Sequence, residues 1–276
     1  MEVGTTFDLM RAFEWASSRD TVQRFLESGE SKLSEQSRSE LGACLKKMDK
    51  ALTAGLHFDS SVEVLVLEGL DGVGKSSIRS SLVSALKALL HPEYDVIDMQ
   101  TPSAVFAPFR KEFQSVDIAT RFAFYNLCNF QFVLDVKEYR SAHLASNPRK
   151  LVVVLDRWWI SSVCGATLEQ HSSGAKLSHI PPVSWPVELP RPSTVTIVCL
   201  TVSEATRIER MGKRESQTWQ ECQLQEDHEA RKCVTDVHKH FAKLGSLFFV
   251  PNDKSVQECV QTIIKVHSQN KERGKI

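Results

Sequence analysis

The sequence predicts an α/β fold: a doubly wound, five-stranded parallel sheet with helices on both faces and an N-terminal helical extension. Helical stretches alternate with apolar, β-branched runs, which lie near residues 62–68, 94–99, 151–155, 195–201 and 246–250. Such alternation is typical of βαβ units, whose strands run parallel and are covered on both sides. Ligands in this architecture bind beyond the carboxyl ends of the strands, so we expect the chemical residues there.

The pattern divides the chain into two regions. From about Thr6 to Ala54 the spacing of apolar residues predicts two helices that separate near Gly29. The alternation of strands and helices begins only after them. We therefore expect a helical N-terminal extension in residues 1–60 and a nucleotide-binding α/β domain in residues 61–276.

Composition argues against several classes of protein. Thirty-four basic and 34 acidic residues cancel, so no overall field draws the molecule to nucleic acid or to an anionic membrane, and neither is an expected partner. The seven cysteines are scattered and contain no C-x-x-C pair, which favours free thiols in a reducing compartment. No apolar run approaches the roughly 20 residues of a membrane span, and no signal-peptide core is present. We expect a soluble intracellular protein, cytoplasmic or mitochondrial.

The most informative motif follows the first predicted strand and leads into a helix. It has the form G-x-x-x-x-G-K-S, the P-loop of nucleoside triphosphate-binding proteins. Its glycines let N–H groups and the helix N-terminus point at phosphate oxygens, its lysine supplies a cation, and its serine supplies a hydroxyl for Mg²⁺. ATP and Mg²⁺ are thus the expected cofactors. The residues predicted to hold ATP are Gly69, Leu70, Asp71, Gly72, Val73, Gly74, Lys75, Ser76 and Ser77.

An acidic and a basic residue follow the third predicted strand. Asp156 comes after five aliphatic residues, and a carboxylate there is suited, with Ser76, to binding Mg²⁺ or its water. Arg157 would project into the same crevice and hold a second phosphate group. The alternative is that both residues cap the strand and pair with neighbours, but the P-loop favours the functional interpretation.

Three arginines follow the fourth predicted strand. On a helix, Arg207, Arg210 and Arg214 lie within about 60° of one another, so their guanidinium groups would share a face. A solvated charged face is the usual reason for such spacing. Phosphoryl transfer, however, needs positive charge on the moving group, and a mobile lid bearing arginines would supply it on closing. We favour the lid.

A polar and aromatic stripe marks the long helix predicted from Ile118 to Ser146. Arg121, Tyr125 and Asn129 recur every four residues and advance about 40° per step. Tyr125 is suited to stacking on a base, and the Asn129 amide is suited to reading its edge because it offers both donors and an acceptor. We expect these three residues to bind the substrate.

Together these motifs resemble the thymidylate kinase family of P-loop nucleoside monophosphate kinases, and within it the mitochondrial-type UMP-CMP kinases. The resemblance rests on the G-x-D-G-x-G-K-S loop, on D-R-W after the third strand and on T-V-S-E-x-x-R-x-x-R-x-x-x-R after the fourth. The closer match rests on short runs such as Phe109-Arg110-Lys111. The resemblance extends from about Val62 to the C-terminus. It implies a kinase that transfers the γ-phosphoryl group of ATP to UMP, CMP or their deoxy forms.

The resemblance also implies roles for single residues. Asp71 would face the acceptor nucleotide, Arg157 would grip its phosphate, and Tyr125 would stack on its pyrimidine. Asn129 stands where thymidylate kinases carry a base-reading arginine, which favours UMP or CMP over dTMP. Two further arginines match the family's lid. The predicted catalytic set is therefore Lys75, Asp71, Arg157 and the lid arginines Arg210 and Arg214.

Three alternatives stay open. The acceptor is dTMP in the first. In the second the chain is a GTPase-like switch or a nucleotide-binding adaptor, although no N-K-x-D guanine-reading motif is present. In the third it is a degenerate relative that binds nucleotides without transferring phosphate. Related kinases also suggest a homodimer through a helical face.

Overall fold

The computed structural model describes residues 14–53, 60–143, 149–172, 194–213, 219–245 and 247–273, with residues 55, 58, 185, 186 and 188–190. Within them lies a five-stranded sheet in the order β2–β3–β1–β4–β5, with every neighbouring pair parallel. The strands are β1 (Val62–Glu68), β2 (Tyr94–Gln100), β3 (Lys150–Asp156), β4 (Val195–Thr201) and β5 (Phe248–Pro251). The predicted doubly wound sheet is confirmed, and each strand overlaps its expected range.

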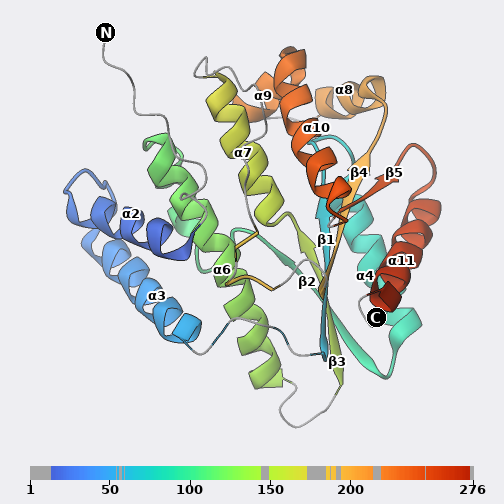
Figure 1. The fold of residues 1–276 in the computed structure, drawn as a ribbon, viewed down its shortest axis with the longest axis horizontal. Helices are drawn as coiled ribbons and strands as arrows, with labels where there is room; N and C mark the ends of the chain where they lie inside the picture. Colours follow the sequence, from blue (N-terminus) through green and yellow to red (C-terminus); the bar gives the residue numbers. More distant parts are fainter. Residues whose placement is uncertain are drawn as a thin grey trace.

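Helices cover both faces of the sheet (Figure 1). One face is covered by α4 (Lys75–Leu90) and α11 (Val256–Arg273). The other is covered by α6 (Ile118–His143), α7 (Trp159–Ser172) and α10 (His228–Lys243). The other described helices are α2 (Trp15–Glu27), α3 (Glu35–Thr53), the 3₁₀ helix η1 (Ala107–Phe109), α5 (Arg110–Phe113), α8 (Glu204–Gly212) and α9 (Trp219–Glu226).

The central strands β1 and β3 are buried on both faces. Val64 and Val66 belong to the core under α6 and α7, whereas Leu65 and Leu67 belong to the core under α4 and α11. A strand that is covered twice requires apolar residues at successive positions, which explains the uninterrupted aliphatic runs in the sequence. Parallel pairing sets Leu67 beside Asp156, so the carboxyl ends of both strands meet at one edge.

The N-terminal helices pack against α6 (Figure 1). Near the start of α2, Trp15 meets Phe130 of α6 edge-on, with ring centroids 5.2 Å apart. The Asn126 amide donates a buried hydrogen bond of 2.9 Å to the Ser18 hydroxyl. The two helices predicted on either side of Gly29 are thus present as α2 and α3, and they share a core with the sheet. The expected start of the first helix, residues 6–13, lies outside the described residues.

The seven cysteines are free thiols, as predicted. Burial raises the pKa of Cys128, Cys164, Cys199 and Cys259, which keeps these thiols protonated at neutral pH. Across the helices that the structure describes, none is both long and apolar enough to cross a bilayer.

A partly buried ion pair fastens the C-terminal helix to the start of β1. Glu63 accepts a hydrogen bond of 3.0 Å from His267 and pairs with Lys271 at 2.6 Å, both on α11. Burial acts to raise the pKa of Glu63, but the bonds from His267 and Lys271 outweigh it and lower the pKa to about 2. Because folding lowers this pKa, the pair's stabilisation is present above the unfolded value of about 4.5 and is lost as the pH falls toward 2.

We expect Glu63→Gln to lower the free energy of unfolding at pH 7 by about 1–3 kcal/mol. The difference from the wild type should shrink as the pH falls below 4.5, which urea unfolding at several pH values would measure. Glu272→Gln, at an exposed site on α11, is the control and should leave stability nearly unchanged. A deficit in Glu63→Gln that does not vary with pH would contradict the assignment.

Candidate active site

The P-loop joins β1 to α4 and is held by its neighbours. Gly69 and Gly74 have φ of 126° and 93°, in the region that glycine enters without strain. A Cβ on Gly69 would lie 2.6 Å from the Leu200 carbonyl oxygen, so no other residue fits unless β4 moves. Asn252 donates a hydrogen bond of 2.7 Å to the Val73 carbonyl oxygen. The loop therefore presents its N–H groups and the N-terminus of α4 together, an arrangement that binds phosphate groups.

Lys75 begins α4, and its ammonium group folds back over the loop. Nζ donates hydrogen bonds of 2.9 Å to the carbonyl oxygens of Gly69 and Leu70, and it lies 3.6 Å from the Asp71 carboxylate. Burial and, to a lesser extent, Arg157 lower the pKa of Lys75 to about 8. Because the ammonium group is poorly solvated, an incoming phosphate group would stabilise it.

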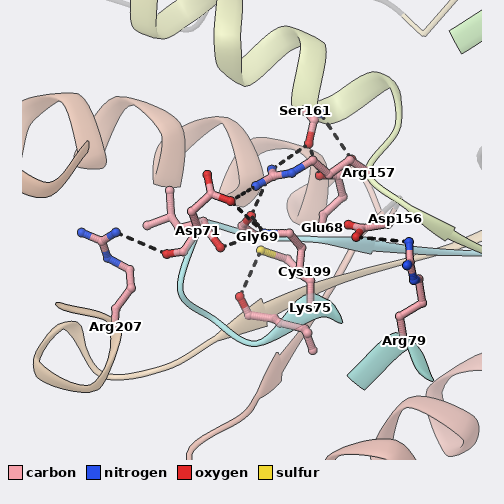
Figure 2. Close-up of polar contacts among 12 residues, drawn as sticks. Glu68, Gly69, Asp71, Lys75, Arg79, Asp156, Arg157, Ser161, Cys199 and Arg207 are labelled. Carbon is pink, nitrogen blue, oxygen red and sulfur yellow. Dashed lines mark hydrogen bonds and ion pairs between the residues drawn. The ribbon is translucent and has the colours of Figure 1, made fainter. Parts of the chain in front are cut away.

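Arg157 follows β3 and turns back across the P-loop (Figure 2). Its φ of 63° is the one positive value among the described residues other than glycine, a conformation that strains the backbone. Nη2 lies 2.5 Å from the Asp71 carboxylate, and Nη1 donates hydrogen bonds of 3.2 Å to the Gly69 carbonyl oxygen and the Ser161 hydroxyl. Burial opposes ionisation, but Asp71 and Glu68 outweigh it and raise the pKa of Arg157. The guanidinium group is therefore charged and fixed over the loop.

Glu68 is a positioning residue that sequence reasoning missed. It ends β1 and is 1% exposed. Its carboxylate accepts hydrogen bonds from the N–H groups of Trp158 (3.0 Å) and Ser161 (3.3 Å) and from the Ser161 hydroxyl (Figure 2). Burial raises the pKa of Glu68 even though these bonds act in the opposite direction. Glu68 thus ties β1 to the segment that carries Arg157. The signal available in the sequence is a charged residue at the end of an otherwise aliphatic strand.

Asp156 ends β3, one residue before Arg157. Its Oδ2 atom lies 3.6 Å from Arg79 (Figure 2), a pairing that the sequence did not predict. Its Oδ1 atom is buried and has no hydrogen-bond partner among the described residues. Ser76 adds an exposed hydroxyl from the first turn of α4. An unsatisfied carboxylate oxygen and a hydroxyl are oxygen ligands of the kind that Mg²⁺ prefers, so these residues fit that ion.

Two of the three arginines that were expected to share one face of a lid both contact the P-loop. Arg207 is 2% exposed; it pairs with Glu204 at 2.8 Å and donates a hydrogen bond of 3.3 Å to the Asp71 carbonyl oxygen. Arg210 is half-buried and donates a hydrogen bond of 3.3 Å to another carbonyl oxygen of the P-loop. Arg207 therefore holds α8 against the P-loop instead of facing solvent. Arg214 lies outside the described residues.

A cavity of about 500 Å³ opens beside the P-loop. Small-molecule sites span roughly 300–1,000 Å³, so it has the size for a nucleotide. Residues 69–71 and Arg157 line it, and so do the three residues predicted from α6: Arg121, Tyr125 and Asn129. The structure thus brings the predicted phosphate-binding and substrate-binding residues to one space.

The three α6 residues differ in the contacts that they already make. Arg121 pairs with Glu169 at 2.6 Å, so its charge already has a counter-charge. Asn129 is buried, and its amide Nδ2 donates a hydrogen bond of 3.0 Å to the Ser162 hydroxyl. Tyr125 is half-buried, so part of its ring is open to the cavity. Among the three, the tyrosine ring and the remaining amide atom are the groups left to contact a base.

His238 is a further cavity residue that had no assigned role in the sequence. Its Nε2 atom lies 3.7 Å from the Cys164 thiol. Burial and the nearby Arg157 lower the pKa of His238 to about 4, so the imidazole is neutral at pH 7. The sequence does not show whether a single histidine on a helix lines a cavity or lies in the core.

Comparison with known proteins agrees with this geometry. The family model for thymidylate kinases matches residues 67–263. The human mitochondrial UMP-CMP kinase 2 is 27% identical over 210 residues, which cover 74% of this chain and 42% of that protein. The chain therefore spans less than half the length of this curated relative. The thymidylate kinase structure from Candida albicans has the same fold, with a TM-score of 0.52 at 16% identity over 76% of this chain and 92% of that one. The chain belongs to the thymidylate kinase family.

Proposed function

We propose that this protein is an ATP-dependent pyrimidine nucleoside monophosphate kinase that phosphorylates UMP or CMP, or dUMP or dCMP, to the diphosphate. The observation that carries this proposal is the cavity in which the P-loop and Arg157 share a wall with Tyr125 and Asn129. The P-loop would bind the phosphate groups of ATP, which is the phosphoryl donor. The Tyr125 ring and the Asn129 amide would bind the base of the acceptor. Membership of the family and the similarity to UMP-CMP kinase 2 support the same activity.

The reaction requires positioning and positive charge without a covalent intermediate. Lys75 would leave the carbonyl oxygens that it now contacts and bind the transferred phosphoryl group. Arg157 would hold the acceptor phosphate in line with it. Asp71 lies 2.5 Å from Arg157 and 3.6 Å from Lys75, so it keeps both cations at the loop until the substrates arrive. Mg²⁺ would neutralise phosphate charge when bound, and Ser76 with Asp156 would hold it.

Asn129 is the residue that we expect to set the choice of base. Its Nδ2 atom is used by Ser162, which leaves Oδ1 as an acceptor. Uracil and cytosine both present an N–H group along the pairing edge, and that group matches an acceptor. An amide at this position therefore suits either base.

Two other functions stay as candidates. The matching family model is that of thymidylate kinases, which keeps dTMP as the alternative acceptor. A nucleotide-binding switch or adaptor would use the same P-loop, but it gives no account of a nucleotide-sized cavity that Tyr125 and Asn129 also line.

The test is an ADP-release assay with ATP and Mg²⁺ against AMP, GMP, UMP, CMP, dUMP, dCMP and dTMP. Stimulation by UMP, CMP or a deoxy counterpart is the expected result. Stimulation by dTMP alone would assign the alternative acceptor, and binding of ATP without stimulation by any acceptor would refute the kinase.

We expect kcat/KM for ATP to fall as the pH rises above about 8. The pKa of Lys75 is lowered to about 8 by burial and by Arg157, so the cation that ATP requires loses its proton from this pH upward. The phosphate groups of the substrates titrate near pH 6, so they do not contribute to the fall in kcat/KM above about pH 8. Initial rates between pH 7 and 10 at saturating acceptor would measure it. A profile that stays flat to pH 10 would contradict the assignment.

A further inference from the structure

The helix α10 contributes one polar side chain to the cavity wall, and the roles proposed for phosphate and base leave it unused. This side chain is His238, which lines the cavity together with Val234 of the same helix. It is 4% exposed, and its Nε2 atom lies 3.7 Å from the Cys164 thiol of α7. The helices α7 and α10 lie side by side on this face of the sheet (Figure 1). A buried polar group in a ligand cavity needs a partner, and the ligand can supply one.

The contacts of α7 show which part of a nucleotide the imidazole can reach. The Ser161 hydroxyl accepts a hydrogen bond of 3.2 Å from Arg157, on the phosphate side, and the Ser162 hydroxyl accepts one of 3.0 Å from Asn129, on the base side. Around the helix axis, Cys164 lies about 60° from Ser161 but about 160° from Ser162. The imidazole beside Cys164 therefore flanks the phosphate side, away from the contact to the base-reading amide. The part of a nucleotide that is bonded to the phosphate group is the sugar.

The charge state of the imidazole also suits a sugar. Burial and, to a lesser extent, Arg157 lower the pKa of His238 to about 4, although a hydrogen bond to the Val234 backbone acts in the opposite direction. The ring is thus neutral at pH 7 and adds no positive charge for a phosphate group. A neutral imidazole has one donor and one acceptor nitrogen, and a hydroxyl group matches either of them. A thiol is a weak hydrogen-bonding group, so a hydroxyl group is a better partner than Cys164.

We propose that His238 recognises a sugar hydroxyl group of the acceptor nucleotide. The inference rests on the proposed kinase function and adds a specificity-determining residue to it. An acceptor without that hydroxyl group leaves the buried imidazole with only the weak thiol contact on the cavity side. The protein therefore selects its acceptor by the sugar as well as by the base.

The test removes the imidazole and the hydroxyl groups separately and together. It uses a series on the base that the wild type prefers, for example CMP, 2′-deoxy-CMP, 3′-deoxy-CMP and 2′,3′-dideoxy-CMP. His238→Leu is expected to lower kcat/KM for CMP about tenfold, to change it less than twofold for the dideoxy nucleotide, and to leave the KM for ATP unchanged. The monodeoxy nucleotide that is also insensitive to the substitution identifies the hydroxyl group.

Two further variants separate recognition from folding. His238→Gln keeps a side chain that can donate and accept a hydrogen bond, so it should restore most of the preference for CMP over the dideoxy nucleotide. His240→Leu is the matched control, because His240 lies on the same helix but outside the cavity wall. It should leave the ratio of the two kcat/KM values as in the wild type.

Two results would overturn the proposal. One is an equal loss for CMP and the dideoxy nucleotide in His238→Leu, because the side chain would then act on the structure of the cavity and not on a hydroxyl group. The other is a preference for CMP that His238→Leu leaves intact. If the wild type phosphorylates no acceptor, the kinase assignment fails. Titration calorimetry of the wild type and His238→Leu with CMP and 2′,3′-dideoxy-CMP then decides whether His238 recognises the sugar.

Discussion

Arg157→Ala is expected to lower kcat/KM for the acceptor by about 10³-fold. Arg157 contacts Asp71 and the Gly69 carbonyl oxygen together, so its guanidinium group lies where the two substrates would meet. Alanine removes both the charge and the fixed hydrogen-bond geometry that would align the acceptor phosphate. Steady-state kinetics with each substrate varied in turn would measure the loss.

A glycine variant separates this loss from a change in folding. Arg157 has a φ of 63°, which costs a residue with a Cβ about 1 kcal/mol or more relative to glycine. We therefore expect the free energy of unfolding of Arg157→Gly to be about 1 kcal/mol higher than that of Arg157→Ala. The two variants should be equally inactive. If Arg157→Gly kept a tenth or more of wild-type turnover, Arg157 would not hold the acceptor phosphate.

The fold could be predicted because its signals are local in the sequence. The aliphatic runs at 62–67 and 151–155 reflect burial on both faces of the sheet. The P-loop was recognisable because its glycines are required by backbone geometry, and Gly69 shows this directly through its closeness to Leu200. The helical pattern of the N-terminal region was also visible, whereas its packing against α6 depends on contacts between distant segments.

The arrangement of the site was harder to predict, because helical spacing reports direction around an axis but not depth. Arg207 has the spacing of a lid arginine, yet it is buried because Glu204 supplies a counter-charge and α8 lies directly against the P-loop. Glu68 gains its significance from Ser161, a residue far away in the chain. Only the three-dimensional structure brings such partners together.

Lys75→Met is expected to lower turnover by about 10³-fold or more and to raise the Tm. Folding lowers the pKa of Lys75 from 10.5 to about 8, chiefly by burial, so the ammonium form is destabilising in the folded state at pH 7. That penalty reaches up to about 3 kcal/mol, and methionine removes it while keeping a flexible chain of similar length. The hydrogen bonds to Gly69 and Leu70 are lost in exchange, which leaves a gain of a few degrees in Tm.

Lys87→Met is the matched control because Lys87 lies on the same helix but is exposed. It should change neither turnover nor Tm, so any effect of Lys75→Met belongs to the buried site. A fall in Tm would mean that the contacts of Lys75 with the loop carbonyls stabilise the fold by more than its desolvation costs. Turnover close to that of the wild type would mean that Lys75 does not contact the transferred phosphoryl group. Loss of turnover with a gain in Tm is the combination expected if the protein holds this cation, at a cost in stability, for the triphosphate.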